Sequence, residues 1–248
     1  MTSDCPIYKR PSLFKFNRMH LIIAYDDSTE DYVTSNVFRF CGALRVEAEQ
    51  LISYQVVRWG SINRLAANVS DGYAFFVNNY RPGDKLFIFG FAGGAFAARV
   101  LANFVARFGV LVRGHTSHKS PVIAYKDGKL DDFKVSKVKP TENFASQIGH
   151  FPPRVYDVQI EVVGCWDTTA SLAASPEFKH FDPSLHKGQV HFPWLSSGSD
   201  DGFPGIKHAF HALALDECRS TFTPALWFLP DDPTVANCNV FFQSNLLC

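Results

Sequence analysis

A short turn of small residues, 90–94 (Gly-Phe-Ala-Gly-Gly), has the residue types and spacing of a site that could do chemistry. An apolar run, residues 86–89, precedes the turn, and apolar residues at helical spacing follow it from Ala95 to Arg107. A strand, a sharp turn and a helix in the pattern Gly-x-Ser-x-Gly form a nucleophile elbow, which exposes a serine oxygen for attack on a carbonyl. Position 92 carries a methyl group, which cannot attack. The segment predicts a nucleophile elbow without its nucleophile, although position 92 could also simply require a small residue.

Asp167 is the candidate acid of such a site, because it closely follows the apolar run 158–165. A carboxylate at this place in a hydrolase would orient a histidine. The alternative is that the Asp167 carboxylate caps the following turn by accepting hydrogen bonds from backbone N–H groups. The sequence leaves both interpretations open.

His208 and His211 are the candidate bases. Both lie in residues 207–218, which we interpret as a helix, and a spacing of three places them on one face of it. The order nucleophile, acid, histidine along the chain also fits a hydrolase. The alternative is that they are packed side chains in the interior of the helix. No third ligand is spaced to complete a metal site with this pair, so we expect no metal.

Alternating strands and helices are predicted to position these residues. We expect strands over residues 20–25, 52–59, 86–89, 158–165 and 239–242, and helices over residues 37–51, 62–80, 95–107 and 207–218. Such alternation is typical of a three-layer α/β sandwich with a mainly parallel central sheet, whose sites lie at the carboxyl ends of the strands. The chain is interpreted as one domain, residues 1–248, with an insertion or cap at about 113–154 and a loop-like region over 174–205.

The composition of the chain limits the kinds of molecule that we expect it to bind and the place where we expect to find it. The chain has 248 residues, and its 24 basic and 24 acidic side chains give a formal net charge of zero. A balanced charge supplies no electrostatic footprint for nucleic acid, so no nucleic-acid partner is expected. The six cysteines are scattered, without a paired Cys-x-x-Cys spacing. No apolar run approaches the ~20 residues that span a bilayer, and no signal-peptide pattern opens the chain, so we expect no transmembrane segment and a cytoplasmic location.

Four separated segments follow one known pattern. They are Asn36-Val37, residues 82–99 (Pro-Gly-Asp, an apolar strand, then Gly-Phe-Ala-Gly-Gly-Ala-Phe-Ala-Ala-Arg), residues 164–169 (Gly-Cys-Trp-Asp-Thr-Thr) and residues 211–217 (His-Ala-Leu-Ala-Leu-Asp-Glu). Through them the chain resembles an uncharacterised α/β-hydrolase family that includes type VI secretion phospholipase effectors and is widespread in fungi. The resemblance covers nearly the whole chain. It implies an α/β-hydrolase fold and hydrolysis of a lipid or another ester by a serine nucleophile.

The chain departs from the family pattern at the positions that would carry out catalysis. Ala92 replaces the serine of the family, and residues 26–28 (Asp-Asp-Ser) replace its Asp-Gly-Thr. The resemblance implies that backbone N–H groups at Gly93 and near position 27 hold an oxyanion, so Asp27 would bring a negative charge to the developing negative charge. A later histidine segment of the family has no counterpart after residues 240–242. Three coordinated changes favour natural loss over a single deliberate replacement of serine.

The preferred hypothesis is a catalytically degenerate hydrolase homologue that has become a binding module. It would hold a lipid or ester-like ligand, or would pair with a protein partner such as an active relative or a second copy of itself. The alternative is a serine esterase or phospholipase-like hydrolase carried as an inactivating Ala92 variant. A dinucleotide-binding protein is disfavoured, because residues 90–94 depart from Gly-x-Gly-x-x-Gly, and no cofactor is expected.

Overall fold

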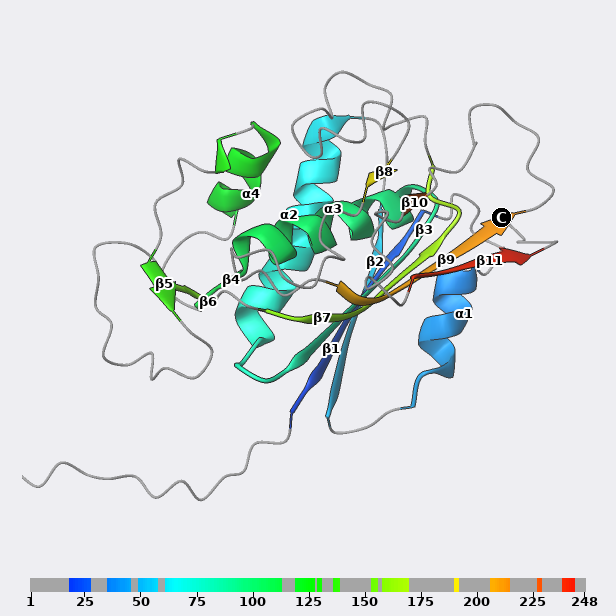
Figure 1. Cartoon of the computed structure of the whole chain (residues 1–248), viewed down its shortest axis with the longest axis horizontal. Coiled ribbons are helices and arrows are strands. Elements are labelled where there is room, and N and C mark those ends of the chain that lie inside the picture. Colours follow the sequence, from blue (N-terminus) through cyan, green and yellow to red (C-terminus); the bar gives the residue numbers. More distant parts are fainter. Residues whose placement is uncertain are drawn as a thin grey trace, which may run out of the picture.

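A six-stranded sheet organises the chain in the computed structural model (Figure 1). The structure describes residues 18–27, 35–45, 49–57, 61–112, 119–127, 129–130, 136–138, 153–155, 158–169, 190–191, 206–214, 227–228 and 238–243. The spatial order of the strands is β11-β9-β7-β3-β1-β2, and every neighbouring pair runs parallel. Their bounds are β1 His20–Asp26, β2 Gln50–Val56, β3 Lys85–Phe91, β7 Ile160–Trp166, β9 Ile206–Ala214 and β11 Cys238–Gln243.

Helices cover both faces of this sheet. Side chains of α2 (Ile62–Asn79) and α3 (Gly93–Phe108) form one large buried cluster with the odd-numbered residues of β1. The even-numbered residues of β1 form a smaller cluster with α1 (Asn36–Ala43) on the opposite face. Successive residues of a strand point to opposite faces, which explains this division. The predicted three-layer α/β fold with a parallel central sheet is confirmed.

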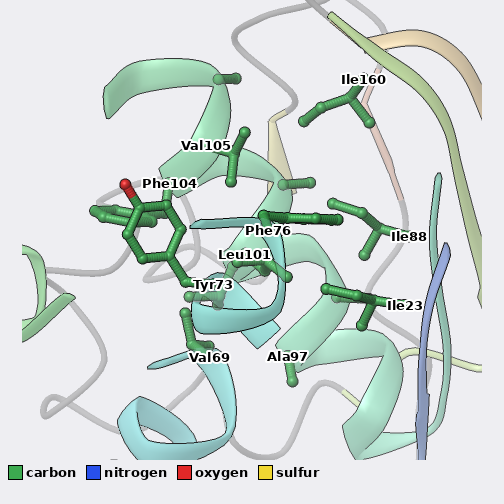
Figure 2. Close-up of a cluster of buried hydrophobic side chains, with 14 of the residues drawn as sticks. Ile23, Val69, Tyr73, Phe76, Ile88, Ala97, Leu101, Phe104, Val105 and Ile160 are labelled. Atoms are coloured by element: carbon green, nitrogen blue, oxygen red, sulfur yellow. The ribbon is translucent and has the colours of Figure 1, made fainter. Parts of the chain in front are cut away.

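The larger cluster is built from aromatic side chains of α2 and α3 and branched side chains of the sheet (Figure 2). The rings of Tyr73 on α2 and Phe104 on α3 meet edge to face, with their centres 4.8 Å apart. Phe76 and Leu101 fill the space between these helices and the sheet. Complete burial of one such side chain stabilises the fold by about 1.5–3 kcal/mol, so this packing fixes α3 against the sheet.

The strand order reverses between β1 and β3, which makes this the switch point of the sheet. The chain leaves β1 toward α1 on one face, and it leaves the neighbouring strand β3 directly into α3 on the other face. Ligand sites in open parallel sheets lie at such a switch point, outside the carboxyl ends of the strands. Asp26, Asp27 and Ala92 occupy the ends of these two strands.

Most predicted elements are confirmed, with a correction near the second strand. The strands expected at 20–25, 86–89, 158–165 and 239–242 and the helices expected at 62–80 and 95–107 correspond to β1, β3, β7, β11, α2 and α3. The helix predicted over 37–51 is too long, because α1 ends at Ala43 and β2 already begins at Gln50. Leu44, with φ −67° and ψ 137°, takes an extended conformation that ends the helix.

The helix predicted over residues 207–218 is wrong, because Ile206–Ala214 form strand β9. Alanine and leucine favour helices when only local propensity is considered. Here β9 lies between β7 and β11 and pairs with both. Pairing with a strand on each side overrides this local preference, because tertiary context decides the state of a short segment.

Smaller elements surround this framework. They are β4 (Val110–Leu111), α4 (Lys119–Lys126), β5 (Ser136–Val138), β6 (Pro153–Val155), β8 (Val190–His191) and β10 (Trp227–Phe228). Strands β4, β6 and β5 form a small sheet, and β8 pairs with β10. The cap expected at about 113–154 and the loop expected at 174–205 lie mostly outside the described residues, and both stay predictions. None of the helices in the described part combines the length and apolarity needed to cross a membrane.

Candidate functional site

Ala92 stands between β3 and α3 in a backbone conformation that side chains rarely adopt. Its φ is 51° and its ψ is −115°. Hydrogen bonds hold it there: its N–H donates to the carbonyl oxygen of Trp166 at 2.8 Å, and its carbonyl oxygen accepts from the N–H of Thr169 at 3.3 Å. Such a conformation costs on the order of 1–3 kcal/mol and persists only where the surroundings enforce it. The half-buried methyl group of Ala92 is therefore presented at a rigid, strained turn.

Gly90 explains how the chain turns so sharply at this point. A β-carbon placed on Gly90 would lie 2.3 Å from the carbonyl oxygen of Gly94, which is closer than any real side chain comes. The strand and the start of the helix can approach this closely only because Gly90 lacks a side chain. Residues 90–94 therefore form a sharp junction between strand β3 and helix α3.

The carboxylate of Asp27 contacts this turn from the end of β1. The N–H of Gly93, the first residue of α3, donates a hydrogen bond to Oδ2 of Asp27 at 3.2 Å. The first N–H groups of a helix have no partner within the helix, and the helix dipole favours a negative charge beside them. Asp27, half-buried at the end of β1, places such a charge at the N–H that directly follows Ala92.

Asp26 points to the opposite face of β1 and serves a separate network. Its fully buried Oδ2 accepts hydrogen bonds from the hydroxyl groups of Ser35 and Tyr54. Ser35 in turn caps α1 by accepting from the N–H of Phe38 at 3.0 Å. Burial and then the bond to Asp26 raise the pKa of Tyr54, and burial together with the Asp26 charge raises that of Cys41. Asp26 thus joins β1, β2 and α1.

Asp167 is tied to the backbone of β9. Its φ is 50°, a left-handed conformation that aspartate tolerates better than most residues. Its Oδ1 accepts a hydrogen bond from the N–H of Ala214 at 3.0 Å, and its own N–H donates to the carbonyl oxygen of Ala212 at 2.9 Å. These bonds anchor the turn after β7 to the neighbouring strand.

His208 and His211 do not share a face, in contrast to the prediction. They lie on strand β9, where an odd separation of three residues points their side chains in opposite directions. His208 is half-buried, and its ring centre lies 6.4 Å from that of Phe210. His211 is fully buried on the other face. The pair therefore cannot act together on one ligand.

The buried His211 ring is held neutral. Burial first, and then the positive charge of Arg99 on α3, lower the pKa of His211 to about 3. Its Nε2 lies 3.5 Å from the N–H of Thr168 and 3.4 Å from the Thr168 hydroxyl oxygen. A neutral imidazole nitrogen can accept from either group. His211 thus lies beside the Thr168–Thr169 segment, which contacts Ala92 through the Thr169 N–H.

The two threonines are the part of the site that the sequence reasoning missed as individual residues. Thr168 and Thr169 are buried and connect β7 to the Ala92 turn and to His211. Their position directly after a predicted buried strand, next to Asp167, is the sequence feature that could have identified them as site residues. Among the described residues, no group of three or more His, Cys, Asp and Glu side chains is arranged to hold a metal ion.

Comparison with known proteins yields two matches. The family model described as "T6SS, Phospholipase effector Tle1-like, catalytic domain" matches residues 20–240. An uncharacterized protein of Saccharomyces cerevisiae is 26% identical over 156 residues, which cover 62% of this chain. The matched region spans only 20% of the yeast protein's own length. No solved structure matches significantly.

Proposed function

The chain belongs to the family of Tle1-like phospholipase effector catalytic domains, and we propose that it is a catalytically degenerate member that binds a lipid or ester-like ligand. The observation that carries the proposal is the conformation of Ala92. A methyl group stands on a strained turn, at the place where this strand–turn–helix pattern presents a nucleophilic oxygen. The proposed nucleophile elbow keeps its backbone geometry and lacks the atom that would form the acyl-enzyme.

Asp27 supports the loss of catalysis independently of Ala92. In an elbow of this type, the N–H of the residue after the nucleophile stabilises the oxyanion. Here that residue is Gly93, and its N–H already donates to the Asp27 carboxylate. A substrate oxygen that becomes negative at this position would meet a fixed negative charge. We therefore propose that Asp27 closes the oxyanion position.

The candidate base is also poorly suited to catalysis. A general base works best when its pKa is near the working pH. The pKa of His211 is about 3, and its Nε2 lies beside Thr168. We assign His211 and Asp167 to positioning the turn after β7, and His208 has no assigned part in the site.

A ligand role is the function that we propose for this end of the sheet. The Ala92 turn, the Asp27 carboxylate and the buried threonines lie at the ends of β1, β3 and β7, and membership of a phospholipase-like family supports a lipid or ester-like ligand there. A neutral ester or the uncharged part of a lipid fits a site with a methyl group and a carboxylate better than an anionic group does, because Asp27 repels negative charge. Pairing with a protein partner is the second proposed role.

Hydrolysis of p-nitrophenyl esters and of phospholipid vesicles tests the proposal. We expect no turnover by the natural chain and no labelling of any serine by a fluorophosphonate probe. Turnover or labelling by the unmodified chain would contradict the degenerate function. If Ala92→Ser alone gives full activity, the alternative holds, and the chain is a serine esterase or phospholipase-like hydrolase carried as an inactive variant. Ligand binding is checked separately, by the thermal shift with short-chain esters and phospholipids.

A further inference from the structure

Strand β2 ends the six-stranded sheet among the strands that the structure describes, and it lacks the usual protection of an edge. Its seven residues, Gln50–Val56, contain no charged residue, no proline and no glycine. All seven pair with β1 in one continuous register without a bulge. Natural edge strands are normally kept apart by charges, prolines, bulges or shortness, since their free backbone groups pair with other strands. Nothing in the composition or register of β2 prevents such pairing.

Exposed apolar side chains accompany this edge. Ile52, Tyr54 and Val56 alternate along β2 and so share one face of the sheet. The ring of Phe38 on α1 packs edge to face on Tyr54, with centres 5.9 Å apart, which identifies this face as the α1 side. Phe38 is 50% exposed and Val56 is 56% exposed. A contiguous apolar patch beside an unprotected edge is typical of an interaction surface.

We propose that a second copy of this chain occupies this edge, with the two β2 strands paired antiparallel about a two-fold axis. An axis normal to the sheet, midway between the two strands at the level of Tyr54, places the two Tyr54 residues opposite each other and sets Ile52 of each copy opposite Val56 of the other. Aromatic and β-branched pairs of this kind stabilise antiparallel strands by roughly 0.2–1 kcal/mol each. The same axis brings the two Phe38 side chains onto one face of the continued sheet.

Charge and preorganisation favour a second copy as the occupant. Identical strands repel each other when they carry charge, and β2 carries none. The formal net charge of the chain is zero, so no long-range repulsion opposes association. The Tyr54 hydroxyl is bonded to Asp26, which holds the ring in place before association and lowers the entropic cost of ordering it. A two-fold pair uses the edge of both copies and therefore closes without growing into a fibre.

Light scattering coupled to size exclusion tests this interface with the full chain. We expect a mass of twice 27.8 kDa, and Val56→Lys should raise the dissociation constant at least tenfold and shift the protein to a monomer. Ile123→Lys is the matched control, since Ile123 is 47% exposed on α4, outside β2, and this variant should remain a dimer. Far-ultraviolet circular dichroism checks that both variants are folded.

Two results would overturn the proposal. A monomer at every concentration up to the solubility limit would mean that another partner, or none, occupies the edge. A dimer that Val56→Lys and Ile52→Lys both leave intact would place the contact elsewhere on the surface. The interface does not depend on the proposed function, because neither variant touches the Ala92 turn.

Discussion

Gly94 at the start of α3 lies directly against Tyr25 at the end of β1. A β-carbon added to Gly94 would stand 2.4 Å from the carbonyl oxygen and 2.7 Å from the carbonyl carbon of Tyr25. Because the atoms in the way belong to a buried backbone, no rotation of a side chain can make room. The approach of these two residues sets the distance between β1 and the start of α3, and it is consistent with the bond from Gly93 to Asp27.

The first prediction concerns this approach. We expect Gly94→Ala to lower the free energy of unfolding by about 3 kcal/mol or more, because the new methyl group forces strand and helix apart. Gly42→Ala in α1 is the control, since nothing lies within 4 Å of its added β-carbon, and it should gain up to about 1 kcal/mol from helix propensity. Urea unfolding measures both. Equal effects would mean that the Gly94 contact does not constrain the fold.

The second prediction separates the two proposed obstacles to catalysis. Adding Asp27→Gly to Ala92→Ser should raise ester hydrolysis by on the order of 10²-fold over Ala92→Ser alone, since it frees the Gly93 N–H for the oxyanion. The control adds Asp127→Gly, which removes an exposed carboxylate that follows α4, and it should leave the rate of hydrolysis unchanged. If Ala92→Ser is equally fast with and without Asp27, the carboxylate does not close the oxyanion position.

The third prediction distinguishes the two roles considered for Asp167. Asparagine tolerates the positive φ and keeps an oxygen for the Ala214 N–H, so Asp167→Asn should unfold within about 0.5 kcal/mol of the natural chain. Asp167→Ala loses that hydrogen bond and should cost about 1–3 kcal/mol. We also expect Asp167→Asn to leave any hydrolysis by the Ala92→Ser variant unchanged. A loss on the order of 10⁴-fold would instead assign Asp167 to orienting a base.

The fourth prediction is a pH dependence caused by His211. The folded state holds the pKa of His211 at about 3, whereas the unfolded chain has the ordinary value of about 6.5. Between these values the unfolded state binds more protons, so stability is complete above about pH 6.5 and falls as the pH is lowered. The slope from this group is at most about 1.4 kcal/mol per pH unit.

Urea unfolding between pH 7 and pH 4 checks this dependence. His211→Gln should remove that part of the slope, while His208→Gln, on the opposite face of β9, should keep it. An unchanged slope in the His211 variant would show that another group causes the acid sensitivity.

The fifth prediction compares two serines that begin helices. Ser35→Ala removes both the cap of α1 and a hydroxyl donor to the buried Asp26, so it should cost about 2 kcal/mol or more. Ser61→Ala removes only the exposed cap of α2, where Oγ accepts from the Arg64 N–H at 3.4 Å, and should cost about 0.5–1 kcal/mol. Thermal unfolding of the two variants measures the difference. Equal costs would exclude a stabilising role for the Ser35–Asp26 bond.

The sequence predicted those parts of the fold in which local pattern and tertiary setting agree. Helix α2 repeats apolar residues at Leu65, Val69, Tyr73 and Phe76, and the structure buries all four. The turn at 90–94 was identified from its glycines, which the structure uses for close backbone contacts. In both places, residues close together in the sequence are enough to predict the local structure.

The geometry of the site was harder to predict from the sequence, because contacts between residues far apart in the chain determine it. Residues 207–214 have the composition of a helix, and only pairing with β7 and β11 makes them a strand and separates His208 from His211. The bond between Gly93 and Asp27 joins residues 66 positions apart. The family resemblance implied that Asp27 approaches the turn, but no local pattern contains the strand register that sets its distance.

The strained conformation of Ala92 has a consequence for how such a protein can change over time. The hydrogen bond that Ala92 donates to Trp166, the one that it accepts from Thr169, and the glycines on either side enforce the turn, and none of them needs a hydroxyl group at position 92. The surroundings therefore hold the backbone of the turn in place whichever small side chain position 92 carries. A substitution at position 92 would thus alter the chemistry of the turn while its shape stays the same.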